Sequence, residues 1–130
     1  MGKQTVRTNL SKNRIYIISE GFFSDIEIID GYNTVICEIE KLKPGFICIS
    51  DISKFKPATP FGAQKLQELS RELIKHGLRK VIQVNCENQL AEMQIERIVE
   101  DELHGMVVQV CTMAEADHMA EILEQLELER

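Results

Sequence analysis

The amino-acid sequence predicts one α/β domain with a mostly parallel sheet of four to five strands and about four helices. Short apolar runs rich in β-branched residues alternate with longer runs whose apolar residues recur at helical spacing, and this alternation continues along the whole chain. It is typical of β-α-β units and therefore of parallel strands. The length of 130 residues suits a single domain, so residues 1–130 are interpreted as one unit.

The chain should begin with two strands and a helix. Residues 1–12 are expected to form an edge strand or a flexible arm, followed by a turn and a more buried strand over residues 14–19. Ser24 and Glu27 have the spacing of a capping box, in which each side chain accepts from a free N–H at a helix start. This pattern predicts a helix over residues 25–42.

The middle of the chain should contain a central strand, a loop and a second helix. Residues 46–50 are apolar and predict a strand that ends at Asp51, and residues 51–58 are expected to form a loop. Thr59 is placed to cap the next helix, with Pro60 in its first turn. Gly77 should end that helix in a left-handed conformation.

The last third should add two strands and two helices. Residues 81–84 and 106–110 predict strands, and Asn88 is placed to cap a helix over residues 89–102. Thr112 should begin a final helix. The expected order of elements is therefore β-β-α-β-α-β-α-β-α, with short connections.

Composition argues against several classes of function. The net charge of -6 and the absence of Trp argue against a nucleic-acid partner. No apolar run approaches the roughly 20 residues that a membrane span needs, and we find no secretory signal, so a cytoplasmic protein is expected. The four cysteines form no C-x-x-C pair and lie in or beside apolar runs, so we expect buried free thiols and no metal site.

The sequence gives little support for catalysis. None of the three histidines, His76, His104 and His118, falls at the carboxyl end of a predicted strand, and no glycine-rich phosphate loop is present. We therefore expect no enzyme activity, no catalytic residues and no cofactor.

Charge is unevenly distributed, since the last helix is acidic and the middle of the chain is basic. The acidic side chains are Glu115, Asp117, Glu121, Glu124, Glu127 and Glu129. Solvated helix faces explain this pattern, and a two-sided surface that supports a homodimer or steers a partner is the alternative.

The segment from Lys54 to Gly62 is unusual because it places two aromatic residues and two prolines at a helix start. Phe55 and Phe61 either fold back into the core or stand exposed as anchors on a stiffened loop. Exposed aromatic anchors of this kind contribute much of the energy of binding interfaces.

This segment and the order of elements resemble a STAS domain, the fold of bacterial anti-sigma factor antagonists. The resemblance rests on residues 51–55, Gly62, the amphipathic helix that follows, Gly77 and the strand over residues 81–84, and it covers the chain from about Arg14. It is shared with the STAS-like group, which is related in architecture to CRAL-TRIO lipid-binding domains. It implies helices on one face of the sheet only.

In antagonists of this family a serine at the helix start is phosphorylated by the partner kinase. Here Thr59, Pro60, Phe61 and Gly62 occupy the four motif positions, and only the glycine matches. The resemblance thus implies a regulatory interaction domain without the usual phosphoserine, and Thr59 is the remaining hydroxyl near that position.

The resemblance also implies a contact surface and a kind of partner. The implied partner-binding residues are Phe55, Lys56, Thr59, Pro60, Phe61 and Gly62. The implied partner is a protein such as an anti-sigma factor or a kinase-like regulator. The competing implication is a small apolar-ligand or lipid-binding domain, and catalysis is the third class. A deep apolar pocket would favour the carrier, an exposed Phe61 a protein partner, and a strongly perturbed acid or thiol an enzyme.

Overall fold

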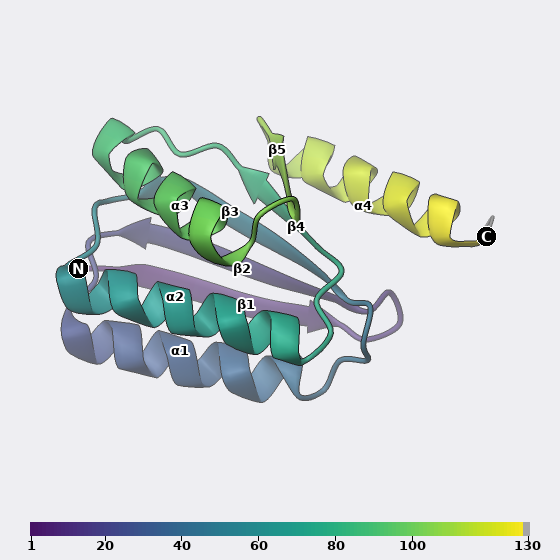
Figure 1. The fold of residues 1–130 in the computed structure, drawn as a ribbon, viewed down its shortest axis with the longest axis horizontal. Helices are drawn as coiled ribbons and strands as arrows, with labels where there is room; N and C mark the ends of the chain where they lie inside the picture. The colour runs from purple at the N-terminus through teal and green to yellow at the C-terminus, as the bar shows by residue number, and fades with distance from the viewer. Residues whose placement is uncertain (129–130) are drawn as a thin grey trace.

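The computed structural model of the chain describes residues 1–128, and its elements follow the expected order (Figure 1). The strands are β1 (Lys3–Asn9), β2 (Arg14–Gly21), β3 (Ile47–Phe55), β4 (Lys80–Val84) and β5 (Val107–Val110). The helices are α1 (Asp25–Ile39), α2 (Pro60–Lys75), α3 (Gln89–Glu102) and α4 (Met113–Leu128). Residues 1–12 contain a paired edge strand, so the expected strand, not a flexible arm, is present.

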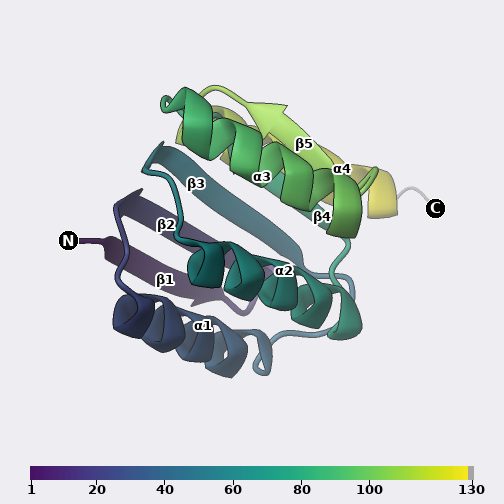
Figure 2. The same ribbon diagram turned by 60° about the vertical axis from the view of Figure 1, so that its left-hand side comes forward.

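The five strands form one sheet in the order β1-β2-β3-β4-β5. β1 runs antiparallel to β2, and the other neighbours are parallel. Because each parallel strand is added on the same side of the one before it, right-handed crossovers place α1, α2 and α3 on one face of the sheet. We call this the inner face, and Figure 2 shows the three helices lying along it.

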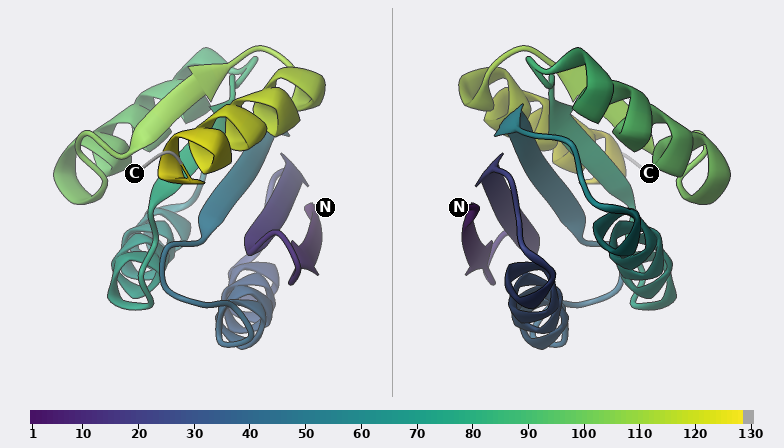
Figure 3. Two further views of the ribbon diagram at one scale, coloured as in Figure 1. Left: turned by 90° about the vertical axis from the view of Figure 1, so that its right-hand side faces the viewer. Right: turned by 90° about the vertical axis from the view of Figure 1, so that its left-hand side faces the viewer.

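The opposite, outer face carries α4, which packs along β3, β4 and β5, as the two views in Figure 3 show. The expectation of helices on one face only is therefore wrong. The outer face carries buried apolar side chains such as Tyr16, Ile49 and Ile82, and Ala116 and Ala120 of α4 pack closely on them. Without α4 these side chains would be exposed to water, which is unfavourable.

A buried arginine fixes α4 to the start of β2. The side chain of Arg14 is 2% exposed, and its guanidinium contacts Glu124 at 2.7 Å and Glu121 at 3.0 Å. Tyr16 donates a hydrogen bond to Asp117 at 2.8 Å. The acidic character of α4 thus has a structural role on the face that meets β2. Glu129 and the side chain of Glu127 lie outside the described part of the chain.

The helix caps occur where the sequence predicts them. Ser24 and Glu27 form a capping box at α1, and Asn88 accepts from Ala91 N–H at the start of α3. Gly77 has φ +99° after α2. Leu78 N–H donates to the carbonyl of Leu73, and Gly77 N–H donates to that of Ile74, which is a Schellman ending.

Two predicted boundaries differ from the structure by three residues or more. β3 continues to Phe55, although residues 51–55 were expected in a loop, because Lys54 and Phe55 pair with Glu20 and Gly21 of β2. α1 ends at Ile39, three residues earlier than expected. The cysteines also differ from the prediction, since Cys48 and Cys86 are buried but Cys37 and Cys111 are exposed.

Candidate functional site

The first residues of α1, α2 and α3 lie at the same end of the molecule (Figure 1). This arrangement follows from the topology, because each of these helices begins just after the carboxyl end of a parallel strand. The segment from Phe55 to Gly62 crosses this end, between the last residue of β3 and the first turn of α2.

Phe55 belongs to the core. Its side chain is 4% exposed, its ring centroid lies 6.0 Å from that of Phe23, and its carbonyl accepts from the Cys86 thiol at 3.6 Å. Of the two positions expected for Phe55, the structure shows the one in the core, and a direct contact with a partner stays an untested prediction. Phe55 ends a strand at an inward-facing position, where its large apolar ring is more stable in contact with Phe23 than in water.

Thr59 caps α2 and also joins it to α1. Its Oγ1 accepts from Gly62 N–H at 3.0 Å and donates to Asp25 Oδ1 at 3.3 Å. Gly62 is buried, and a Cβ at this position would lie 3.5 Å from Cδ1 of Ile28. The starts of α1 and α2 are therefore in contact at Gly62, and this residue belongs to the packing between the two helices.

The other side of the segment is joined to α3 by a pair of hydrogen bonds. Ala58 N–H donates to Gln94 Oε1 at 2.8 Å, and Gln94 Nε2 donates back to the Ala58 carbonyl at 3.0 Å. With the Thr59–Asp25 contact on one side and Gln94 on the other, the loop is fixed between two helices.

The side chains that remain open to solvent in this segment are those of Lys56, Thr59 and Pro60, while Phe61 is half-buried. Lys65 Nζ lies 5.9 Å from the centre of the Phe61 ring and 4.9 Å from that of Tyr32. One part of the Phe61 ring is therefore exposed to solvent, and the other part lies near Lys65 of α2.

Exposed apolar side chains also occur near the starts of α1 and α3, the two helices to which this segment is hydrogen-bonded. Ile26 of α1 is 73% exposed and Met93 of α3 is 65% exposed, and Phe22 and Leu90 are also exposed. Sequence reasoning missed these four residues. The available signal was that Ile26 and Met93 do not belong to the buried stripe of their helices, whose members are Gly31, Val35 and Ile39 in α1 and Ala91, Ile95 and Ile98 in α3.

Two buried thiols are shifted away from reactivity, Cys86 at this end of the sheet and Cys48 at the opposite end of β3. Burial raises the pKa of the Cys48 thiol to about 12 and also raises that of Cys86, so both thiols stay protonated at neutral pH and are weak nucleophiles. Asp51 accepts from the backbone and hydroxyl of Ser53 at 3.0 and 2.7 Å. Within residues 1–128 no group of three or more His, Cys, Asp or Glu side chains is placed to hold a metal ion.

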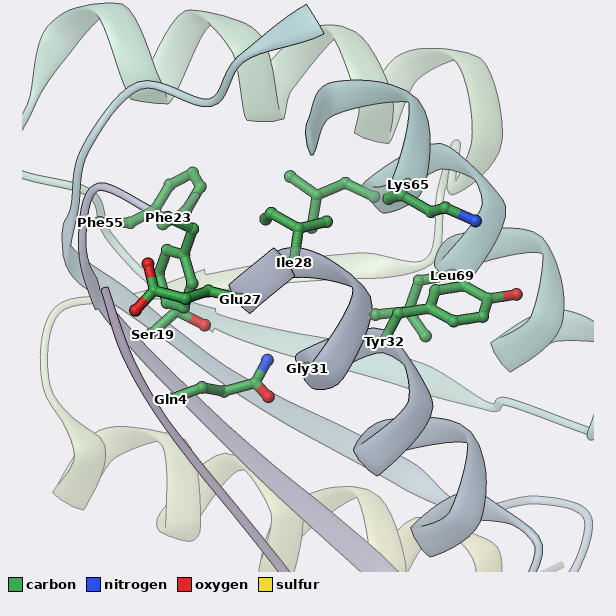
Figure 4. A pocket seen from close by; sticks show the side chains of 11 residues that line it. Gln4, Ser19, Phe23, Glu27, Ile28, Gly31, Tyr32, Phe55, Lys65 and Leu69 are labelled. Carbon is green, nitrogen blue, oxygen red and sulfur yellow. The ribbon is translucent and has the colours of Figure 1, made fainter. Parts of the chain in front are cut away.

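A cavity of about 110 Å³ lies between the inner face of the sheet and helices α2 and α3. A smaller pocket of about 40 Å³ adjoins it between α1 and α2 and is shown in Figure 4. Both spaces are lined by Gln4, Ser19, Phe55, Leu66 and Leu69. Among the described helices, none combines the length and apolar character needed to cross a membrane.

Neither a family model nor a curated protein matches this sequence. The fold is similar to a solved structure described as "The overall structure of SLC26A9", with a TM-score of 0.54 and 19% sequence identity. The match covers 90% of this chain and 21% of that chain, so this chain spans about a fifth of the longer protein. At this identity the likeness concerns the fold alone, which is an α/β, STAS-like fold with four described helices and a mostly parallel five-stranded sheet.

Proposed function

We propose that this chain is a non-enzymatic protein-interaction domain that binds its partner at the common end of α1, α2 and α3. The contact surface, here called the helix-start surface, consists of Phe22, Ile26, Lys56, Thr59, Pro60, Phe61, Leu90 and Met93. The observation that carries the proposal is the group of exposed apolar side chains near the starts of the two helices to which the loop is hydrogen-bonded.

Exposed large apolar side chains are common singly, but a group around one feature is typical of interaction sites. The hydrogen bonds of Ala58 and Thr59 hold the loop in place before a partner arrives. A loop that is already ordered loses less conformational entropy on binding, which favours affinity. Gly62 and Phe55, which are buried at the two ends of the loop, contribute to partner binding by fixing the loop conformation.

This surface is proposed to act without a phosphoryl switch at Thr59. The Thr59 hydroxyl already interacts with Gly62 N–H and with Asp25. A phosphate on Thr59 would place two negative charges beside the Asp25 carboxylate, and the repulsion would oppose the favourable effect of the helix start. Regulation is instead expected through the presence or absence of the partner.

The fold resemblance suggests a cytoplasmic regulator of the anti-sigma factor or kinase-like type as the partner. A lipid carrier is less well supported, because the cavity of about 110 Å³ is below the roughly 300–1,000 Å³ of most ligand sites for larger molecules. A homodimer that uses the same surface is an alternative outcome of the test below.

The test compares three forms of the chain in pull-down from native cytosol followed by titration of the purified partner. One form is wild type, one carries Ile26→Lys and Met93→Lys, and the control carries Ile122→Lys and Leu126→Lys on the exposed side of α4. Loss of central anchors weakens interfaces by about 2 kcal/mol or more, so we expect at least a roughly 30-fold weaker Kd for the helix-start variant and little change for the control.

Equal binding by all three forms, or loss of binding only in the α4 control, would contradict the proposed surface. Circular dichroism of each form checks that the exposed substitutions leave the fold intact. Sedimentation of wild type alone separates a foreign partner from self-association.

A further inference from the structure

One strand of the sheet carries a polar side chain where an apolar one is expected. Gln83 lies in β4, between β3 and β5, and points to the inner face beside the cavity of about 110 Å³. Strands that are covered on both faces usually carry apolar residues on both. The other residues of β4 that are buried, Val81, Ile82 and Val84, follow this rule.

The carboxamide of Gln83 lacks a hydrogen-bond partner within residues 1–128, although the residue is only 7% exposed. Ser50 is its neighbour on β3 by strand register and also lines the cavity, and its hydroxyl lacks a partner in the same part of the chain. No side-chain oxygen or nitrogen of the described residues is both sealed from solvent and unpartnered. The two polar groups are therefore open to the cavity.

A glutamine side chain offers two N–H donors and a carbonyl acceptor. Burial without partners is unfavourable, so the fold gains free energy when another molecule hydrogen-bonds to this group. The remaining wall of the cavity is mainly apolar, with Ile17 from β2, Leu69 from α2 and Ile98 from α3. A molecule that matches this wall has an apolar body and one polar head.

The adjoining pocket between α1 and α2 gives this cavity an approach from the surface. Figure 4 shows Gln4 and Ser19 on the sheet side of this pocket, with Tyr32 and Lys65 on the helix side. The cavity and the pocket are together of the same order as the roughly 150 Å³ apolar cavity of an engineered protein that holds benzene. The space suits one ring or a short branched chain, and it is too small for an acyl chain.

We propose that this cavity is a binding site for a small, mainly apolar molecule with a single hydrogen-bonding head group, which Gln83 and Ser50 hold by its head. The site is distinct from the helix-start surface, so a failure of either proposal leaves the other standing. Gln83 selects the ligand by its head group, and the apolar wall selects it by size.

Phenol and toluene form a matched pair of probes, since they have similar size and only phenol has a hydroxyl. In NMR titrations of the intact chain labelled with ¹⁵N, we expect phenol to shift the Gln83 side-chain NH₂ signals and the amides of residues 49–52 and 82–84 in a saturable way. A neutral hydrogen bond corresponds to roughly a fivefold change in affinity, so toluene should bind about fivefold more weakly or worse.

Gln83→Leu keeps an apolar strand and removes the polar contact, and it should abolish the preference for phenol over toluene. Gln109→Leu is the matched control, because Gln109 pairs with Gln83 in the sheet but is exposed and does not line the cavity. This control should keep the preference. Ser50→Ala is the second variant, and it should reduce the preference in the same direction.

The proposal is overturned if phenol causes no saturable shift, if toluene binds equally well, or if Gln83→Leu keeps the preference for phenol. A crystal structure of wild type soaked in phenol that shows only ordered water on the Gln83 carboxamide would also overturn it, since the cavity would then be a hydrated part of the core.

Discussion

Replacing Thr59 by alanine tests whether the start of α2 depends on one hydroxyl. The side chain accepts from Gly62 N–H at 3.0 Å and donates to Asp25 at 3.3 Å. Loss of an N-cap hydroxyl destabilises a protein by about 1 kcal/mol. The Asp25 contact is long and exposed, so it should add little.

This loss should be visible as a lower melting temperature. A folded chain of this length has an unfolding entropy of roughly 0.27 kcal/mol per kelvin, so a loss of about 1 kcal/mol corresponds to about 4 °C. Thr59→Ser retains the hydroxyl and should melt within about 2 °C of wild type, because serine and threonine cap with similar strength.

Differential scanning calorimetry of wild type, Thr59→Ala and Thr59→Ser at one pH measures both differences. Melting of Thr59→Ala at the wild-type temperature would show that the hydroxyl contributes nothing to the stability of α2. An equally low melting temperature for Thr59→Ser and Thr59→Ala would show that the loss comes from the methyl group and not from the cap.

Three further predictions concern the stability and chemistry of the fold. Gly77→Ala should destabilise the chain by at least about 2 kcal/mol in chemical denaturation, because the residue has φ +99° and a Cβ would lie 2.7 Å from the Pro44 Cα; a change below about 0.5 kcal/mol would contradict this. Hydrogen bonds from basic side chains lower the pKa of Glu121, so its contribution is present above its unfolded pKa of about 4.3 and is lost as pH falls through the lower folded pKa. Wild type should therefore be more stable than Glu121→Gln at pH 6, and the difference should shrink as pH falls below about 4; a difference that grows on acidification would contradict the sign. In the native chain a thiol reagent at pH 8 should label the exposed Cys111 and leave Cys48 unlabelled until unfolding, and mass spectrometry of labelled peptides reads this directly.

The helix layer could be predicted from sequence because its signals are local. Capping residues such as Ser24, Thr59 and Asn88 lie within three residues of the N–H groups that they satisfy, and the buried helical positions recur at regular spacing. The Schellman ending at Gly77 is local in the same way.

The errors arise where distant parts of the chain decide the structure. Asp51, Ser53 and Lys54 look like loop residues, but β3 continues through them because β2 offers paired backbone groups as far as Gly21. The position of α4 on the outer face depends on the apolar side chains that four separate strands place there.

The candidate site was predicted only in part for the same reason. The segment was located from its composition, and the Thr59 cap follows from local spacing. The two hydrogen bonds between Gln94 and Ala58 join residues 36 positions apart, and the burial of Phe55 depends on Phe23. Gln83 falls within the strand predicted over residues 81–84, and one polar residue in such a run gives no indication of a cavity beside it.

The chain is proposed to bind a protein partner through the helix-start surface. Hydrogen–deuterium exchange of the native chain, alone and saturated with the purified partner, tests it most directly, because exchange slows where a partner covers the backbone. We expect added protection at residues 22–30, 56–64 and 88–95, with α4 unchanged. Protection confined to α4 or to the edge strand β1 would rule out the helix-start surface as the binding site.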